Sequence, residues 1–445
     1  MKIVHISTSD IQGGAARSAY RHHRALLKKN VDSSMLVAGK ASNDSSVAQF
    51  QPEKGFRRRL ARMIRKERLQ HEFKKYENSR PTGLEPFNDD RSPFGNELSR
   101  HFPDADLINL HWIAGFLDYR SFLRKNRPGI PIVWTLHDMA PFTGGCHFDN
   151  SCGEFAAKCG NCPQLGSSRP NDLSRQIWMR KKAAFEKISP EQLHFVAPSR
   201  WLARVARSSS LLRKFTTTVI PYGIDTDLFS PRGNVFAMRD ALEIPRSARI
   251  LLFLAEYTDN RRKGFAFLDE ALMRFSSEDN VFLLSIGNGT PTPKAKLPHL
   301  HLGPIANDRL LSSIYSLADV FVIPSIQDNL PNTVLEAMAC GTPVVGFDSG
   351  GIRDMVENGK NGFLAPTGNT QALADALHEI LPPQICQEMG DSSREKVLRE
   401  FREELQAIRY TELYRKLSAK PQTDLSERNG SAEPDQLSTN AVLSK

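Results

Sequence analysis

The 445-residue sequence lacks a run of about 18 or more apolar residues, the length that a membrane-spanning helix requires. It also lacks the apolar core and cleavage site of a signal peptide, because it opens directly with a strand-like segment, KIVHIS at residues 2–7. These two absences argue against a membrane-spanning protein and predict a cytoplasmic one.

Outside one segment the chain has little excess of charge. The formal net charge is +9, and residues 51–80 hold eleven Lys or Arg against four Glu, a balance of +7 that leaves +2 for all other residues. A nucleic-acid-binding domain spreads its basic residues over a face, usually with interleaved aromatics. The distribution therefore predicts no nucleic-acid partner.

Short apolar segments alternate with helix-forming segments along the chain. The segments that predict buried strands are residues 2–7, 31–38, 106–111 and 130–136 in the first half and 249–255, 281–286, 320–324 and 343–347 in the second. Alternation of this kind is typical of α/β proteins with parallel sheets. We expect two doubly wound Rossmann-like domains that face each other across a cleft.

The stretch from residue 318 to residue 362 carries the strongest signal. A strand at residues 320–324 is followed by a polar loop, by a short helix for which Asn332 stands as N-cap and Gly341 as stop, and by a second strand. Ligands of open parallel sheets bind outside the carboxyl ends of the strands, where a helix N-terminus offers free N–H groups. The loop residues are therefore a candidate phosphate cradle: Asp328, Asn329, Leu330, Pro331 and Asn332.

Two carboxylates flank this loop. Asp328 lies in it, and Glu336 follows eight positions later in the helix. A carboxylate can accept two hydrogen bonds from a vicinal diol, which both a ribose and a sugar ring present. One carboxylate for the ribose and one for the sugar ring, with a diphosphate between the two rings, predict a nucleotide-sugar site. The alternative is an ordinary acidic residue near a helix start, which complements the helix dipole.

Residues 336–345, EAMACGTPVV, resemble the donor-binding signature of the retaining glycosyltransferases of family 4. In that signature two glutamates are separated by seven residues, and Asp328 takes the place of the first, which keeps the charge and shortens the reach by one methylene. Residues 221–231, PYGIDTDLFSP, resemble the family's interdomain linker. The resemblance covers roughly residues 1–417 and implies the GT-B arrangement of two facing domains.

On this basis we assign residues 1–214 to an acceptor-side domain and residues 215–392 to a donor-binding domain. The resemblance implies that a helix at residues 393–417 packs back on the first domain. Residues 418–445 are polar with few large apolar side chains and predict a disordered tail.

The resemblance also implies roles for residues outside the signature. Gly13 and Gly14, in a turn after the first strand, would face the donor sugar and diphosphate, and His137 would face the sugar near its reacting carbon. His111 is a weaker candidate for shaping the acceptor pocket. A histidine at a strand end is also often a structural, hydrogen-bonded residue.

A cationic loop precedes Gly264 in the second half. Lys263 matches the family lysine, and Arg262 or Arg261 would replace the family arginine. Such cations suit a diphosphate whose negative charge grows as it leaves, although basic loops at protein surfaces are common.

Four of the six cysteines, Cys146, Cys152, Cys159 and Cys162, lie within an insertion at residues 143–166. In a reducing compartment, a Cys-x-x-Cys pair with two further thiolates is typical of a structural zinc site without an open coordination position. A redox-active or disulfide-bonded pair and simple buried thiols are the alternatives. The insertion is similar to a run in the exopolysaccharide and colanic-acid-type subset of the family.

Residues 54–76 predict a basic helix with an apolar stripe that includes Phe56, Leu60 and Met63. Such a helix can lie in the headgroup region of an anionic leaflet, here the inner face of the cytoplasmic membrane. The alternative is a surface helix whose stripe packs on its own domain.

Taken together, the sequence predicts a retaining glycosyltransferase that moves a sugar from a nucleotide-diphosphate sugar to a saccharide or lipid-linked saccharide in cell-surface or exopolysaccharide synthesis. We expect no catalytic cofactor, because no Asp-x-Asp metal motif is well placed at a strand end; residues 225–227 (DTD) have the letters but lie in the linker. A nucleotide-sugar epimerase of the same fold and a non-catalytic nucleotide-sugar-binding protein are the alternatives. Dependence on an acceptor separates a glycosyltransferase from an epimerase. Nucleotide release separates both enzymes from a non-catalytic binding protein.

Overall fold

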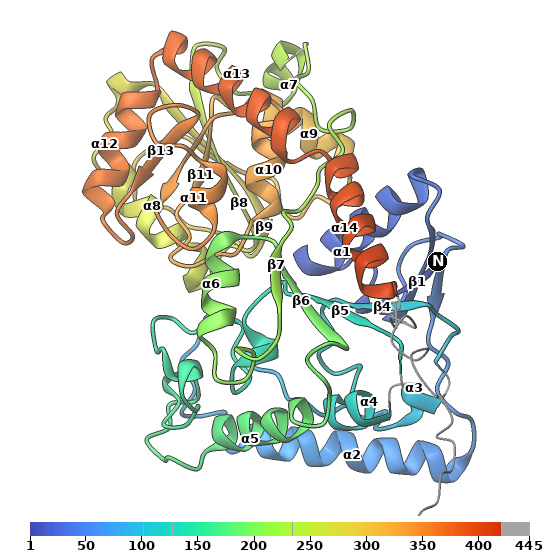
Figure 1. Cartoon of the computed structure of the whole chain (residues 1–445). Helices are drawn as coiled ribbons and strands as arrows, with labels where there is room; N and C mark the ends of the chain where they lie inside the picture. Colours follow the sequence, from blue (N-terminus) through green and yellow to red (C-terminus); the bar gives the residue numbers. More distant parts are fainter. Residues whose placement is uncertain (101, 126–128, 234, 420–445) are drawn as a thin grey trace, which may run out of the picture.

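The computed structural model describes residues 1–100, 102–125, 129–233 and 235–419, and it folds into two α/β domains (Figure 1). Within these residues, the first domain contains a sheet in the order β3-β2-β1-β4-β5-β6-β7 and the second a sheet in the order β10-β9-β8-β11-β12-β13. Neighbouring strands are parallel throughout both sheets. The predicted fold class is confirmed.

The strands of the first sheet are β1 (Lys2–Ser9), β2 (Asp32–Gly39), β3 (Val47–Gln49), β4 (Leu107–Leu110), β5 (Ile132–Thr135), β6 (Leu193–Ala197) and β7 (Thr217–Val219). Those of the second are β8 (Arg249–Tyr257), β9 (Val281–Asn288), β10 (His299–His301), β11 (Val320–Ile323), β12 (Val344–Phe347) and β13 (Gly362–Ala365). The central strands β4, β5, β11 and β12 are buried along their whole length. Helices cover both faces of such a sheet, which is why these strands read as continuous apolar runs in the sequence.

The helices of the first domain are α1 (Gly14–Lys28), α2 (Phe56–Lys74), α3 (Glu97–Arg100), α4 (Tyr119–Lys125), α5 (Leu173–Phe185) and α6 (Arg200–Ser208). Those that follow are α7 (Val235–Ala241), α8 (Phe265–Leu272), α9 (Asp308–Leu317), α10 (Asn332–Ala339), α11 (Ile352–Met355), α12 (Thr370–Ile380), α13 (Pro383–Glu400) and α14 (Glu403–Ser418). No helix in the described ranges is long and apolar enough to cross a membrane.

The chain leaves the first domain later than expected. β7 pairs in parallel with β6 and so belongs to the first sheet, although it lies beyond the predicted boundary between residues 214 and 215. Its three residues are β-branched, which suits an edge strand. The crossover to the second domain therefore begins after Val219.

The predicted helix at residues 393–417 is two helices rather than one. α13 packs on the second domain and α14 on α1 of the first (Figure 1). Between them the Phe401 carbonyl accepts a hydrogen bond from the Ile224 N–H (2.8 Å), and the Glu403 N–H donates to the Ile224 carbonyl (3.1 Å). These bonds to the linker replace helical ones and break the helix, and α14 then buries Tyr410 and Tyr414 against the first domain. α14 extends to Ser418, and residues 420–445 of the predicted tail lie outside the described residues.

Candidate active site

The loop between β11 and α10 lies at the carboxyl edge of the second sheet, as predicted. The N-cap position of α10 is held by Pro331, not by Asn332. Asn332 is the first helical residue, and its amide nitrogen donates to the Gly14 carbonyl (3.1 Å) and to the Ser18 hydroxyl (2.8 Å) of α1. The N-cap prediction for Asn332 is therefore wrong, because its side chain is used to join the two domains at α10.

Asp328 meets both predicted cations. Its carboxylate lies 2.6 Å from the Lys263 ammonium nitrogen and 3.0 Å from an Arg262 guanidinium nitrogen. Burial would raise the pKa of the Asp328 carboxyl, but the charges of Lys263 and Arg262 outweigh burial and lower the pKa to about 2. The structure thus gathers these three predicted residues, while Arg261 is exposed and lies outside the group.

Arg262 is enclosed by groups from the first domain. Its guanidinium lies 2.6 Å from the Glu85 carboxylate and 4.1 Å from the centre of the Phe148 ring. It also donates to the Gln327 carbonyl (2.8 Å), and Gln327 in turn donates to the Asp149 carboxylate (2.8 Å). Sequence reasoning missed Glu85 and Phe148, since neither lies in a motif.

Glu336 is buried and already paired. One carboxylate oxygen lies 2.7 Å from the Arg21 guanidinium of α1, and the other accepts a hydrogen bond from the Tyr315 hydroxyl of α9 (3.0 Å). Arg21 also contacts Asp308 at 3.4 Å. The acid expected to bind a ribose is therefore neutralised by an arginine of the other domain, and nothing in the sequence pointed to Arg21.

His137 faces the loop from the first domain. Its carbonyl accepts a hydrogen bond from the Asn329 side-chain amide (3.1 Å), and the Asn329 amide oxygen accepts one from Ser199 (2.7 Å). Its ring nitrogens are hydrogen-bonded to His111 (3.0 Å) and to the Tyr222 hydroxyl (2.6 Å). Burial lowers the pKa of His137 to about 4, so its imidazole is neutral near pH 7.

The other predicted donor-site residues contribute main chain or packing. Leu330 is buried in the core of the second domain. Gly13 has a φ of +88°, in the region that favours glycine, and the space where its side chain would stand is open. Gly14 begins α1 and contacts Asn332 through its carbonyl.

A small cavity lies beside His137 in the first domain, and His111, Trp112, Asp138 and Lys181 are among its lining residues. Asp138 accepts a hydrogen bond from the Trp112 indole (3.1 Å) and lies 3.1 Å from a His147 ring nitrogen. His111 therefore lines a polar recess of the first domain, and its role in an acceptor pocket stays a prediction.

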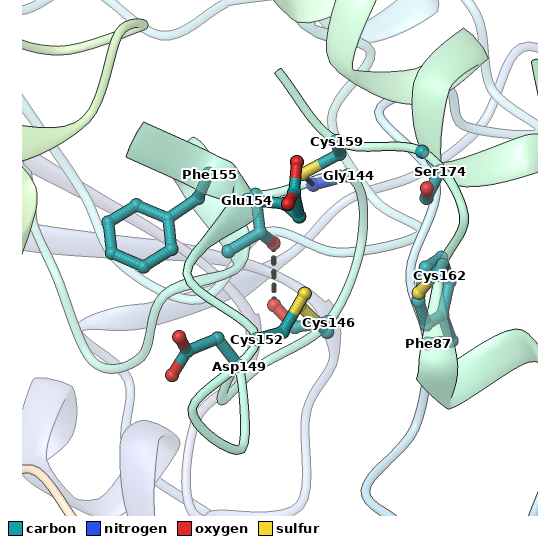
Figure 2. A pocket seen from close by; sticks show the side chains of 12 residues that line it. Phe87, Gly144, Cys146, Asp149, Cys152, Glu154, Phe155, Cys159, Cys162 and Ser174 are labelled. Carbon is teal, nitrogen blue, oxygen red and sulfur yellow. Dashed lines mark hydrogen bonds between the residues drawn. The ribbon is translucent and has the colours of Figure 1, made fainter. Parts of the chain in front are cut away.

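The four clustered cysteines line one cavity of the first domain (Figure 2). All four are free thiols, and burial raises the pKa of Cys159 to about 12 and that of Cys162 to about 11. A main-chain N–H, that of Gly144, donates to the Cys159 sulfur (3.1 Å). In the described part of the chain, however, no group of three or more His, Cys, Asp or Glu side chains is arranged to hold a metal ion. The zinc site stays a prediction.

The insertion that carries these cysteines reaches the domain interface. The Asn150 N–H donates to the Gln327 side-chain oxygen (3.1 Å), next to the contacts that Phe148 and Asp149 make with the second domain. The first aspartate of the DTD run in the linker is engaged in contacts within the protein. Asp225 lies 3.1 Å from the Lys28 ammonium nitrogen and accepts a hydrogen bond from the main-chain N–H of Leu228.

The chain matches known protein families and curated proteins. Residues 12–228 match the family model Glycosyltransferase Family 4, and residues 248–382 match Glycosyl transferases group 1. The chain is similar to alpha-maltose-1-phosphate synthase of Mycolicibacterium smegmatis, with 31% identity over 71% of this chain and 80% of the relative. It is similar to the putative colanic acid biosynthesis glycosyl transferase WcaC of Escherichia coli, with 23% identity over 87% of this chain and 92% of the relative. In a further curated relative the match spans 61% of that protein's length.

Solved structures share the architecture. The structure of Anabaena Alr3699/HepE in complex with UDP-glucose has a TM-score of 0.63 and 16% identity, and the match covers 94% of this chain and 100% of that one. Since two consecutive family models cover most of both parallel-sheet domains, this chain belongs to the glycosyltransferases of family 4 and has their GT-B fold.

Proposed function

We propose that this glycosyltransferase moves a sugar from a nucleoside-diphosphate sugar, held by the second domain, to a hydroxyl of a saccharide or lipid-linked saccharide held against the first. The observation that carries the proposal is the convergence of Lys263, Arg262 and Asp328 at the start of α10, with His137 directly across the interface. Cations, helix N–H groups and a carboxylate are what a diphosphate joined to a polyhydroxyl sugar requires.

In the proposed donor complex, ligand groups replace contacts that the protein now makes with itself. The diphosphate would take Lys263 and Arg262 from Asp328 and Glu85, which frees Asp328 for hydroxyls of the donor sugar. The ribose would bind Glu336 in place of Arg21. Arg21 would keep Asp308, Glu85 would keep the hydrogen bond from the Asn260 side chain, and Asp328 and Glu336 would exchange ion pairs for hydrogen bonds from ligand hydroxyls.

For the chemical step we propose retention of configuration without a metal ion. The bond from the anomeric carbon to the diphosphate breaks, the bond from that carbon to the acceptor oxygen forms on the same face, and the acceptor proton leaves with the diphosphate. Lys263, Arg262 and the N-terminus of α10 would stabilise the charge that develops on the diphosphate. The UDP-glucose complex of the Anabaena neighbour and the names of the two relatives support a nucleotide sugar and a saccharide as the substrate classes.

The decisive experiment measures release of nucleoside diphosphate from a panel of UDP-, GDP- and ADP-sugars, with and without a lipid-linked saccharide extract. We expect release from one donor that depends on the extract and is lost in Lys263→Met. Glu395→Gln, an exposed acid of α13, is the matched control and should behave as wild type. Release without transfer, accompanied by a changed free sugar, would favour an epimerase, and donor binding without release would favour a non-catalytic protein.

We further propose that α2 places the enzyme on an anionic membrane. No residue of α2 is buried, and Phe56, Met63 and Ile64 are 80%, 56% and 42% exposed among arginines and lysines. The helix lies on the edge of the first domain remote from the second (Figure 1). Each cation near an anionic leaflet adds about 1 kcal/mol of attraction, and the apolar side chains add burial.

Sedimentation with lipid vesicles tests this surface. We expect the protein to sediment with vesicles that contain phosphatidylglycerol and not with vesicles of phosphatidylcholine alone. Changing Phe56 and Met63 to serine should abolish sedimentation, whereas Met273→Ser, a residue 54% exposed in the second domain, should not. Equal binding by the α2 variant and wild type would contradict the proposal.

A further inference from the structure

A chain of three hydrogen-bonded imidazoles crosses the first domain. Nδ1 of His5 lies 2.9 Å from Nε2 of His111, and Nδ1 of His111 lies 3.0 Å from Nε2 of His137. Nδ1 of His137 lies 2.6 Å from the Tyr222 hydroxyl, which belongs to the interdomain linker. His5 lies on β1, His111 directly after β4 and His137 two residues after β5, and these strands are neighbours in the sheet, so the row of imidazoles runs across the strands.

All three rings are neutral at ordinary pH. Burial holds the pKa values of His5 and His111 far below the usual range and lowers that of His137 to about 4. The nearest further rings on the His5 side, His22 and His23, have centres 5.3 and 5.6 Å from His5, and burial lowers their pKa values to about 3 and about 4. No ring in this cluster therefore carries a charge that would disturb the chain near pH 7.

Neutrality restricts the chain to two protonation patterns. A neutral imidazole has one N–H and one lone pair, so each ring can donate only in the direction in which its neighbour accepts. Either every N–H points toward Tyr222 or every N–H points toward His5. The state of His137 is thereby coupled to that of His5, although the two rings do not touch.

The environment of His5, at one end of the row of imidazoles, decides between these two protonation patterns. Nε2 of His5 is buried and has no hydrogen-bond partner among the described residues. If the N–H groups pointed toward His5, this nitrogen would carry a buried and unpaired hydrogen. Orphaned N–H groups are rarer in protein interiors than orphaned acceptors. The favoured pattern therefore puts hydrogen on Nδ1 of His5, of His111 and of His137.

We propose that His5 and His111 are positioning residues that hold His137 in the tautomer with hydrogen on Nδ1. This inference rests on the proposed function, in which His137 lines the donor-sugar site. His137 then presents an N–H toward Tyr222, and a sugar oxygen that displaced the Tyr222 hydroxyl would meet a hydrogen-bond donor.

The first test measures the tautomer directly in the full chain without a sugar donor. Nitrogen-15 shifts of the histidine rings at pH 7.5 should show hydrogen on Nδ1 of His137. In His111→Asp, whose carboxylate can only accept a hydrogen bond, we expect hydrogen to move to Nε2 of His137. In the matched variant His111→Asn the amide nitrogen stands in place of Nδ1 and can still donate, so His137 should keep the wild-type tautomer.

The second test follows turnover with the donor found in the release assay. His111→Asp should lower kcat about tenfold, the effect of one lost hydrogen bond, and His111→Asn should retain most of the wild-type kcat. Hydrogen on Nε2 of His137 in the wild type, or an unchanged tautomer in His111→Asp, would overturn the inference. The expected tautomers in a protein that releases no nucleotide would overturn the proposed function and leave the coupling of the histidines standing.

Discussion

Acidification should destabilise this protein because its interior holds neutral histidines. Burial lowers the pKa of His22 to about 3 and the pKa values of His23, His137 and His194 to about 4, whereas the unfolded chain keeps values near 6.5. As the pH falls below about 6.5, the unfolded chain binds protons that the folded chain cannot accept. The free energy of unfolding then decreases, and it continues to decrease until the native histidines titrate near pH 4.

The magnitude is large relative to the stability of a typical domain. At pH 5 each of these four histidines lowers the free energy of unfolding by about 2 kcal/mol, or about 8 kcal/mol together. Asp90 acts in the opposite sense, because burial and the neighbouring Asp89 raise its pKa to about 7. Its protonation in the folded protein raises the free energy of unfolding at pH 5 by about 2.5 kcal/mol. For these five groups the net loss is between about 5 and 6 kcal/mol, and His5 and His111, whose pKa values burial also lowers, add to it. The total stability of ordinary proteins is about 5–15 kcal/mol.

Urea unfolding followed by circular dichroism at pH 7.5, 6.5, 5.5 and 5.0 measures this loss. The matched variant is His194→Gln, since His194 lies on β6 and, among the described residues, its ring hydrogen-bonds Thr218 alone. It should reduce the loss between pH 7.5 and pH 5 by about 2 kcal/mol. His71→Gln, at an exposed position of α2, should retain the wild-type profile. A free energy of unfolding that stays constant down to pH 5, or a wild-type slope in His194→Gln, would refute the reasoning.

Three further predictions concern charges and thiols. Glu85→Gln removes the carboxylate that competes for Arg262, so calorimetry should show nucleoside diphosphate binding roughly tenfold tighter, and weaker binding would contradict this. Arg21→Met leaves Glu336 buried without its cation and should cost about 3–5 kcal/mol in urea unfolding, most of it restored when Glu336→Gln is added. The zinc predicted from the sequence should appear as one equivalent per chain by elemental analysis and disappear in Cys159→Ser, whereas metal-free wild type with alkylatable thiols would reject it.

The secondary structure around the site was predictable because its signals are local. The strand before Asp328, the helix that contains Glu336 and the strand after it are set by apolar runs and breakers a few residues apart. The grouping of Lys263 with Asp328 also followed, because the carboxyl ends of parallel strands meet at one sheet edge. Asn332 was wrongly predicted to be the N-cap of α10. A helix cap and an interdomain contact both use the side-chain amide of asparagine, so the sequence does not distinguish them.

The partners of the charged residues were not predictable in this way. Arg21 and Glu336 are 315 positions apart, and Glu85 and Arg262 are 177 apart. Their pairing depends on how the two domains face each other, and no periodic pattern in the sequence indicates that arrangement. The same is true of the three hydrogen-bonded histidines, because nothing in the strand sequence KIVHISTS indicates which residues His5 will meet.

The sequence alone determined the α/β class, the two-domain organisation, the family resemblance and the loop that would hold a donor, since each depends on short-range patterns. Only the tertiary structure decided that the first sheet continues through β7, that the C-terminal helix breaks at the linker, and that Arg21 pairs with Glu336 and Glu85 with Arg262 in the candidate site. The physical reason is that a buried charge or imidazole must find a partner, and the identity of that partner is set by which distant surfaces the fold brings together.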